Sequence, residues 1–272
     1  MTIQAYVSQP VPTGMVGQFI AGLGYPLRGL KFMREHSLWG LASASIVVNA
    51  LLLIGVLVLA FSWIVPWVQG SVAAMVAWAG ASAFWGFLVG VLNWLIWVLV
   101  LPATVVLSFV VLVLVGQAVA SPFLDTLSEE VESRVLGTPT TPMTAKRMVQ
   151  DVTVALVDLA GGLILLCCVN LPILVIGLIP GIGTLVGPLL SFMFTALLLA
   201  HEFVGLSMAR HLVSYRGRWR AVWANRWSAL GLGTSAMGLL FVPVVNLVLL
   251  PLAAVGGTLL YCDLRAAGRI SV

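Results

Sequence analysis

The side chains best placed for chemistry lie in residues 121–136, which read SPFLDTLSEEVESRVL. Asp125, Glu129 and Glu132 follow one another at spacings of four and three residues, so a helix would carry all three carboxylates on one side. The Ser-Pro pair that opens the segment has the residue types preferred at the N-cap and first position of a helix. The sequence therefore predicts an amphipathic helix that begins here, with one acidic and one apolar side.

Basic side chains gather in two other segments. In residues 18–36, Arg28, Lys31 and Arg34 recur every three residues on one broad side of a predicted helix. Such a basic amphipathic helix is suited to the surface of an anionic membrane. A second segment, within 206–226, holds five arginines and overlaps tryptophans spaced four residues apart, namely Trp219, Trp223 and Trp227. Binding at a lipid interface explains this pattern better than binding to nucleic acid does.

Patterns for catalysis or metal binding are missing from the sequence. Neither H-E-x-x-H nor G-x-S-x-G occurs. His201 beside Glu202 is a candidate proton-sensitive pair, although anchoring at an interface is the favoured interpretation. The cysteines form no C-x-x-C pair and are expected to pack as small apolar side chains. We therefore expect no enzyme activity, no bound metal and no cofactor.

The composition indicates that the charged segments described above are connected by membrane-spanning helices. Of the 272 residues, 61% are hydrophobic and 8% are charged, and the mean hydropathy is +1.13, whereas soluble domains contain about 25% charged residues. Three stretches contain no Asp, Glu, Lys or Arg; they are residues 37–124, 159–200 and 227–262. Because a membrane-spanning helix needs about 20 apolar residues, the sequence predicts an all-α polytopic membrane protein. A cytosolic enzyme, a secreted domain and a nucleic-acid binder are excluded.

The first charge-free stretch is long enough for two spanning helices, which we expect within 41–118. We place one span at about 41–65, ending at Pro66, and the other at about 90–118. Residues 66–86 are rich in Ala, Gly and Trp, and resemble an interfacial segment between the spans.

The second stretch is marginal for two spans and is expected to form a helical hairpin over 152–205. Its turn is predicted at Pro180, Gly181 and Gly183, which leaves arms of about 21 and 17 residues. Pro188 interrupts the second arm.

The third stretch is too short for two spans and is expected to form a re-entrant hairpin over 227–264. With a turn at Pro243–Asn246, each arm has about 16 residues and is ~24 Å long, against ~30 Å of hydrocarbon. Pro243 and Pro251 repeat the eight-residue spacing of Pro180 and Pro188. If this spacing is a true repeat, the two stretches are copies of one hairpin, and internal repeats are common in transporters.

Basic residues flank all three stretches, so each is expected to return to the side from which it entered. All thirteen Lys and Arg would then lie on one face of the membrane, which the positive-inside rule makes the cytoplasmic face. The net charge of +4 is explained by this rule without a polyanionic partner.

Four stretches of the sequence resemble the CysZ family, bacterial inner-membrane proteins associated with sulfate uptake and related to the eukaryotic etoposide-induced membrane proteins. They are residues 29–49, SPFLDTLSEEVESRVLG at 121–137, IPGIG at 179–183, and VPVVNLVLLPLAAVGGTLLYCD at 242–263. The resemblance implies one integral membrane domain over 1–272, with two long transmembrane helices, two hemi-penetrating hairpins and assembly as a homo-oligomer. It also implies sulfate permeation across the bacterial inner membrane, with the lipid bilayer and an inorganic anion as partners.

The resemblance places an anion site at the start of the acidic helix, where the family has Gly-Leu-Leu-x-Glu. The matching residues here are Asp125, Thr126, Leu127, Ser128 and Glu129, of which Leu127 and Glu129 agree with the family. Such a site would use free backbone N–H groups and a guanidinium group.

The family also has an Arg-Arg pair that binds the anion, but this chain has Trp39 and Gly40 at those positions. Arg28, Lys31 and Arg34 are the candidates to replace the missing cations. The hairpin residues Pro180, Gly181, Gly183, Pro188, Pro243 and Pro251 are candidates for the path. Because the Arg pair is missing, a non-transporting scaffold or a lipid- or envelope-organising protein of the same fold stays open as the alternative.

Overall fold

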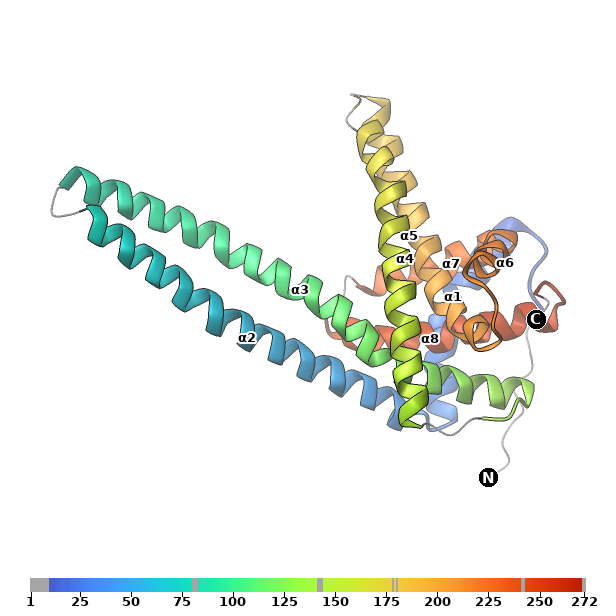
Figure 1. Cartoon of the computed structure of the whole chain (residues 1–272). Coiled ribbons are helices and arrows are strands. Elements are labelled where there is room, and N and C mark those ends of the chain that lie inside the picture. The colour runs from blue at the N-terminus through green and yellow to red at the C-terminus, as the bar shows by residue number, and fades with distance from the viewer. Residues whose placement is uncertain are drawn as a thin grey trace. The chain divides into compact units, whose positions relative to one another are not determined.

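A computed structural model describes residues 10–79, 83–140, 144–177, 179, 181–240 and 243–270. The regular structure in these residues is helical (Figure 1). The helices are α1 (Met15–Glu35), α2 (Trp39–Ala79), α3 (Ala83–Leu136), α4 (Ala145–Gly177), α5 (Ile182–Arg210), α6 (Tyr215–Ala224), α7 (Arg226–Leu240) and α8 (Pro243–Ala266). The chain divides into two compact units, one of residues 47–119 and a larger one of residues 1–46 with 120–272.

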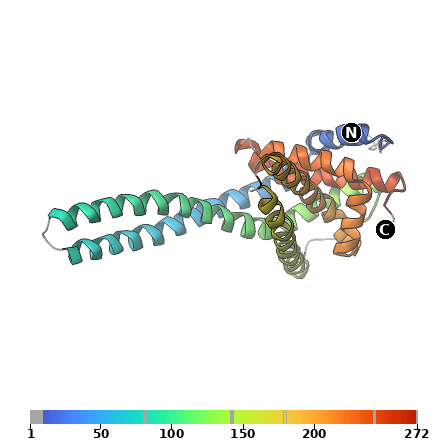
Figure 2. The same ribbon diagram turned by 90° about the horizontal axis from the view of Figure 1, so that it is seen from above.

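The smaller unit consists of the long apolar parts of α2 and α3, which run side by side (Figure 2). α2 has 41 residues and continues through Pro66, so the predicted end of the span at Pro66 and the separate segment 66–86 are wrong. A proline removes one backbone hydrogen bond, but in apolar surroundings no water competes for the remaining bonds of the helix. Two helical stretches here are apolar and long enough to cross a membrane, Trp39–Ala77 and Phe84–Val105.

The acidic segment 121–136 is the last part of α3, which has 54 residues, and does not form a helix of its own. The predicted helix start at Ser121 and Pro122 is therefore wrong. The predicted division into sides is confirmed, because Leu124, Leu127 and Val131 are buried in apolar clusters.

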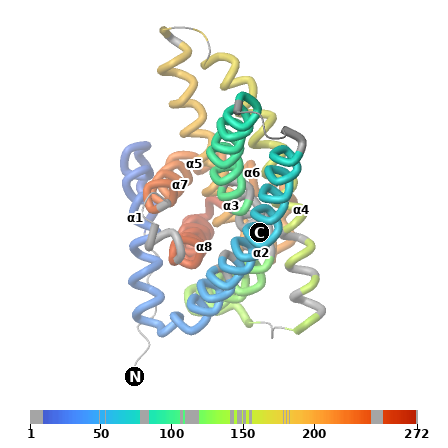
Figure 3. The backbone as a smooth tube through the Cα atoms, turned by 90° about the vertical axis from the view of Figure 1, so that its left-hand side faces the viewer, coloured from blue at the N-terminus to red at the C-terminus, as the bar shows by residue number. Residues whose placement is uncertain are grey.

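In the larger unit α1, α5, α7 and α8 pack with their backbones in close contact (Figure 3). A Cβ atom built on Gly22 of α1 would lie 2.8 Å from the Cα of Gly231 on α7. One built on Gly29 would lie 2.9 Å from the carbonyl oxygen of Leu252 on α8, and one on Gly257 would lie 2.6 Å from the carbonyl carbon of Phe203 on α5. Glycines at these positions therefore let the helices approach more closely than any other residue would allow.

α4 and α5 form the predicted hairpin of stretch 159–200. The chain reverses between Gly177 and Ile182, and Gly181 has the positive φ of 88° that such a turn requires. Pro180 lies outside the described residues. Both arms are long enough to span a membrane, over Leu156–Gly177 and Gly183–Arg210.

α7 and α8 form a second hairpin, which lies in the interior of the larger unit. α7 has 15 residues and is only ~22 Å long, which is less than the ~30 Å of hydrocarbon. The apolar stretch Val248–Ala266 of α8 is long enough to span, but 83% of it is buried inside the protein. The turn predicted at Pro243 is wrong, because Pro243 is the first residue of α8.

Candidate functional site

The ends of α3, α5 and α8 meet in a group of charged and polar side chains, which we call the Glu132 cluster. It comprises Asp125, Ser128 and Glu132 of α3, Ser207, Arg210 and the following His211 of α5, and Thr258, Tyr261 and Arg265 of α8. α3 presents its three members to the cluster because spacings of three and four residues place Asp125, Ser128 and Glu132 on one side of the helix, next to the side that buries Leu127 and Val131.

Glu132 is the centre of the cluster. Its side chain is only 3% exposed, and its two carboxylate oxygens accept from different partners. Arg210 Nη2 lies 2.9 Å from Oε2, while His211 Nε2 and Arg265 Nη1 lie 2.5 and 3.5 Å from Oε1. A buried carboxylate is tolerated only when it is paired in this way.

Arg210 connects Glu132 to a second carboxylate. Its Nη1 donates to Asp125, at 2.7 Å from Oδ1 and 3.0 Å from the backbone oxygen. Its Nη2 donates to Ser128 Oγ at 3.0 Å, in addition to Glu132. The planar fork of the guanidinium therefore holds two acidic side chains and one hydroxyl of α3 at once.

Three hydroxyl groups line the inner edge of the cluster. Ser128 Oγ lies 2.6 Å from Thr258 Oγ1 of α8 and 3.2 Å from Ser207 Oγ of α5. All three side chains are completely buried. Hydroxyls can both donate and accept, so this edge can solvate a carboxylate or another anion oxygen without carrying charge.

The position of the cluster explains why it needs several cations. Arg210 and Arg265 lie in the last turns of α5 and α8, and Glu132 lies in the penultimate turn of α3. The C-terminus of a helix carries a partial negative charge, which repels anions and attracts cations. An anion is stable at this meeting of helix ends only because Arg210, His211 and Arg265 surround it.

The residues predicted for the start of the acidic helix have separate environments. Thr126 donates to the backbone oxygen of Pro122 at 2.8 Å, and Leu127 is fully buried in the apolar core. Ser128 belongs to the Glu132 cluster, and Glu129 is 7% exposed. Because α3 is continuous here, their backbone N–H groups are not those of a helix start, and the predicted N-terminal anion site is wrong in that respect.

The predicted basic residues of α1 lie apart from the Glu132 cluster. Arg28 is 3.6 Å from Asp263 and lies over the ring of Tyr25, whose hydroxyl donates to Asp263 at 2.9 Å. Lys31 is 3.8 Å from Glu35, and Arg34 is exposed. A role of these cations in anion binding stays a prediction.

The hairpin residues that were predicted to line an anion pathway do not share one environment. Gly181 is exposed in the α4–α5 turn and Gly183 is buried near the start of α5. Pro188 lines a cavity of about 620 Å³ between α4 and α5. The polar residues of this cavity are Asn170, Thr184 and Ser191, and Ser191 donates to Asn170 across the two helices. Pro251 is buried in α8.

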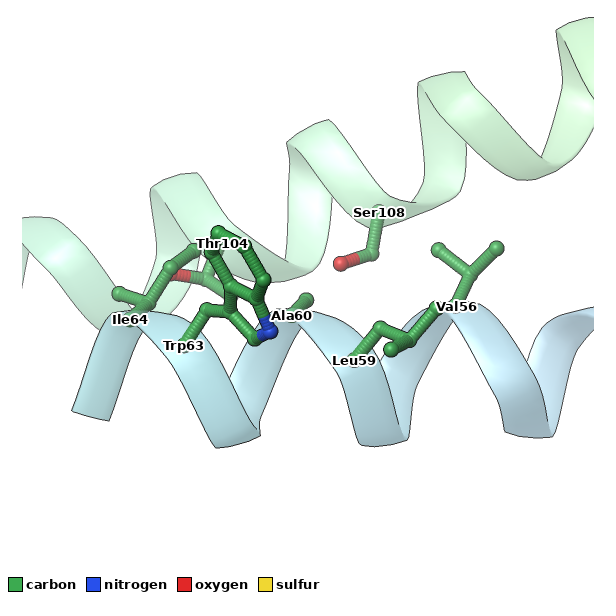
Figure 4. Close-up of a pocket in the computed structure, with 7 residues that line it drawn as sticks. All are labelled: Val56, Leu59, Ala60, Trp63, Ile64, Thr104 and Ser108. Carbon is green, nitrogen blue, oxygen red and sulfur yellow. The ribbon is translucent and has the colours of Figure 1, made fainter. Parts of the chain in front are cut away.

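A second cavity, of about 390 Å³, lies between α2 and α3 in the smaller unit. Figure 4 shows Thr104 and Ser108 of α3 facing an apolar wall of α2 that is formed by Val56, Leu59, Ala60, Trp63 and Ile64. None of the lining residues is charged. This cavity therefore suits an apolar group and has no means of balancing the charge of an anion.

A further polar contact joins α4, α5 and α6. Arg218 of α6 makes a bidentate ion pair with Asp158 of α4, at 2.8 and 2.9 Å. His201 of α5 is 1% exposed and stacks on Trp219 of α6, with 4.6 Å between ring centroids. Its Nδ1 lies 3.9 Å from Glu202 Oε1. His201 is thus buried, whereas the side chain of Glu202 is 26% exposed, and the interpretation of interfacial anchoring stays a prediction.

No group of three or more His, Cys, Asp or Glu suited to a metal ion occurs among the described residues.

Comparison with known proteins connects this geometry to a family. The family model described as "Sulfate transporter CysZ/Etoposide-induced protein 2.4" (EI24) matches residues 25–251. The chain belongs to the EI24 family. This match includes all of α3 to α7 and most members of the Glu132 cluster, and it identifies the chain as one of a family of transporters and not of enzymes.

Several curated EI24 relatives carry the name "Sulfate transporter CysZ". Those of Vibrio parahaemolyticus and Vibrio cholerae are 24% and 25% identical to this chain, over 88% and 89% of it and 93% and 92% of their own lengths. That of Pseudomonas syringae pv. tomato is 23% identical over 93% of this chain and 96% of its own.

The sequence did not single out the basic half of the Glu132 cluster. Arg210, His211 and Arg265 were seen only as charges flanking the apolar stretches, because their partners lie far away in the chain. One signal was available, since α3, α5 and α8 each have an arginine in the last turn. Where several helix C-termini that carry cations come together, an anion is expected between them, either bound or supplied by a side chain.

Proposed function

We propose that this protein is an anion permease of the bacterial inner membrane and that sulfate is its substrate. Its membership of the EI24 family and the relatives named as sulfate transporters support this proposal. The observation that carries it is the Glu132 cluster, in which two guanidinium groups and the imidazole of His211 converge on one carboxylate. Three buried hydroxyls lie beside them and reach Arg210 through Ser128.

In this proposal the carboxylate of Glu132 occupies the anion site when no sulfate is bound. Sulfate presents oxygens to guanidinium and imidazolium donors in the same manner as a carboxylate does. When sulfate enters, it replaces Glu132 as acceptor for Arg210, His211 and Arg265, while Asp125 keeps Arg210 in position. Glu132 thus keeps the cations paired when no anion is bound, and an entering anion must bind these cations more strongly than the carboxylate does.

The arrangement of the helices supports the expected membrane topology. In the proposal α2 and α3 cross the bilayer, and α4 and α5 enter it as a hairpin whose polar cavity at Asn170, Thr184 and Ser191 belongs to the path. α7 and α8 do not cross, because α7 is too short and α8 is buried in the protein. We further propose a homo-oligomer, since the apolar outer faces of α2 and α4 can pack against a second copy as well as against lipid.

Radioactive sulfate uptake into vesicles that contain the purified protein tests the proposal. Wild type is expected to carry sulfate above empty vesicles. Arg210→Lys keeps the positive charge but loses the fork that binds Glu132 and Asp125 together, and is expected to reduce the flux about tenfold or more. Arg134→Gln is the control, because within the described residues Arg134 pairs with the partly exposed Glu130 and the backbone of His36, and its flux should stay near wild type.

Two outcomes would contradict parts of the proposal. Folded wild-type protein that carries no sulfate would favour the alternative, a non-transporting scaffold of the same fold. Flux that is equal in wild type and Arg210→Lys would keep the permease but remove the Glu132 cluster from its path.

A further inference from the structure

One face of α6 exposes two cations that have no acidic partner among the described residues. Arg216, Arg220 and Trp223 lie at spacings of four and three residues, so they share one side of the helix, and all three are exposed. We call them the α6 outer face. The opposite side, with Arg218, Trp219 and Val222, packs onto the protein.

The cations of this face differ from those of α1 in their pairing. On α1, Arg28 and Lys31 lie within 4 Å of Asp263 and Glu35. Within the described part of the chain, Arg216 and Arg220 form no ion pair, and the sequence has no Asp or Glu between Glu202 and Asp263. The positive charge of the α6 outer face is therefore left for a partner outside the protein.

The ion pair of Arg218 fixes the depth of α6 along the spanning helices. Its partner Asp158 is the third residue of the stretch Leu156–Gly177. A Cβ built on Gly205 would lie 3.5 Å from Arg218 Nη1, and Gly205 is five residues from the end of the stretch Gly183–Arg210. α6 thus lies beside the ends of two apolar stretches, at the level where lipid headgroups meet the hydrocarbon.

Trp223 supports the same location. Its side chain is 52% exposed, next to the two arginines. Tryptophan is enriched at the membrane interface, where its apolar ring and its N–H group are both accommodated. Arginine binds a phosphate group through two parallel hydrogen bonds, which suits it to lipid headgroups.

We propose that the α6 outer face binds the phosphate groups of anionic phospholipids at the membrane surface. This binding is independent of sulfate transport. It uses Arg216 and Arg220 for charge and Trp223 for contact with the acyl region, while Arg218 and Trp219 hold the helix to α4 and α5.

The test measures binding of phosphatidylglycerol to the purified full chain in non-ionic detergent, by native mass spectrometry, with phosphatidylcholine as the neutral lipid. Arg216→Gln combined with Arg220→Gln is expected to weaken phosphatidylglycerol binding about 30-fold, since each basic residue contributes about fivefold at a lipid surface. Lys31→Gln combined with Arg34→Gln removes the same charge from α1 and should weaken this binding less than the α6 variant does, because Lys31 already lies close to Glu35.

Three results would overturn the proposal: an α6 variant that binds phosphatidylglycerol like wild type, equal loss in both double variants, or complete competition by inorganic phosphate. A second measurement uses wild type alone and needs no variant to fold. Phosphatidylglycerol, but not phosphatidylcholine, should slow amide hydrogen exchange within residues 215–224, and exchange that does not change there would also contradict the proposal.

Discussion

At the scale of single residues, Glu132 carries more of the electrostatic organisation than its neighbours in the acidic segment. It is nearly inaccessible to solvent and joins the ends of three helices through Arg210, His211 and Arg265. Glu130, two residues earlier, pairs with Arg134 of the same helix, and both side chains are about one-third exposed. Two glutamates about half a helical turn apart therefore differ in role: Glu132 links separate helices, whereas Glu130 pairs within its own helix.

Glu132→Gln is expected to destabilise the protein by about 3 kcal/mol or more, because it leaves buried cations without their anion. Glu130→Gln is the matched control and should cost less than ~1 kcal/mol, since solvent screens its pair with Arg134. Thermal unfolding in detergent compares the two variants. Equal effects would mean that the Glu132 cluster does not hold the helix ends together.

The acidic half of this cluster could be predicted from the sequence and the basic half could not. The spacing of Asp125 and Glu132 places both on one side of a helix, which the structure confirms. Arg210 is 78 residues from Glu132 and is brought to it by the packing of α5 on α8. No local pattern contains that information, because it depends on contacts between distant helices.

At the scale of elements, glycines determine how closely the helices of the larger unit pack. Gly22 and Gly231 face each other between α1 and α7, and Gly29 and Gly256 do so between α1 and α8. Close backbone approach maximises van der Waals contact, which is the main attraction between helices surrounded by lipid. These positions tolerate no side chain, whereas other glycines of the same helices do.

Gly22→Ala and Gly24→Ala are expected to change stability in opposite directions. The new Cβ of Gly22→Ala meets backbone atoms of α7, which cannot move aside, so a loss of about 1–3 kcal/mol is expected. The Cβ of Gly24→Ala meets nothing within 4 Å, and the better helix propensity of alanine should add up to about 1 kcal/mol. The unfolding temperatures of both variants are compared with that of wild type. A stabilised Gly22→Ala variant would show that α1 and α7 are not in close contact.

Prolines limited how well the elements could be predicted. Charge and hydropathy predicted the long helices of the first stretch and the α4–α5 hairpin. Pro66, Pro122 and Pro243 were interpreted as boundaries or turns, yet the first two lie inside helices and the third begins one. The cost of a proline depends on whether neighbours or solvent can satisfy the freed carbonyl, and a single sequence does not reveal those neighbours.

At the scale of the whole molecule, apolar side chains cover the outside of the candidate spans. On α4 even Cys167 and Cys168 point outward, whereas Cys262 of α8 is buried. Both α4 cysteines lie near the middle of the apolar stretch Leu156–Gly177. If this stretch lies in the bilayer, the surrounding lipid keeps water-soluble reagents away from exposed side chains.

A charged maleimide is therefore expected to leave all three native cysteines unlabelled in intact membranes. After denaturation in dodecyl sulfate, the same reagent should label all three. Ser214→Cys serves as the positive control, because Ser214 is exposed between α5 and α6 and should react in membranes open on that side. Rapid labelling of Cys167 or Cys168 in intact membranes would place α4 in water.

The packing of α1 on α8 also has a consequence for biosynthesis. Tyr25 and Asp263, which bond to each other, are 238 residues apart in the chain. At ~5–20 residues per second a ribosome needs on the order of tens of seconds to travel that distance. During this time α1 and then α5 are completed while the surfaces that receive α8 are still open. The nascent chain must therefore be inserted and protected before its core can close, and a ribosome that stalls before α8 would leave a product that membrane proteases can recognise.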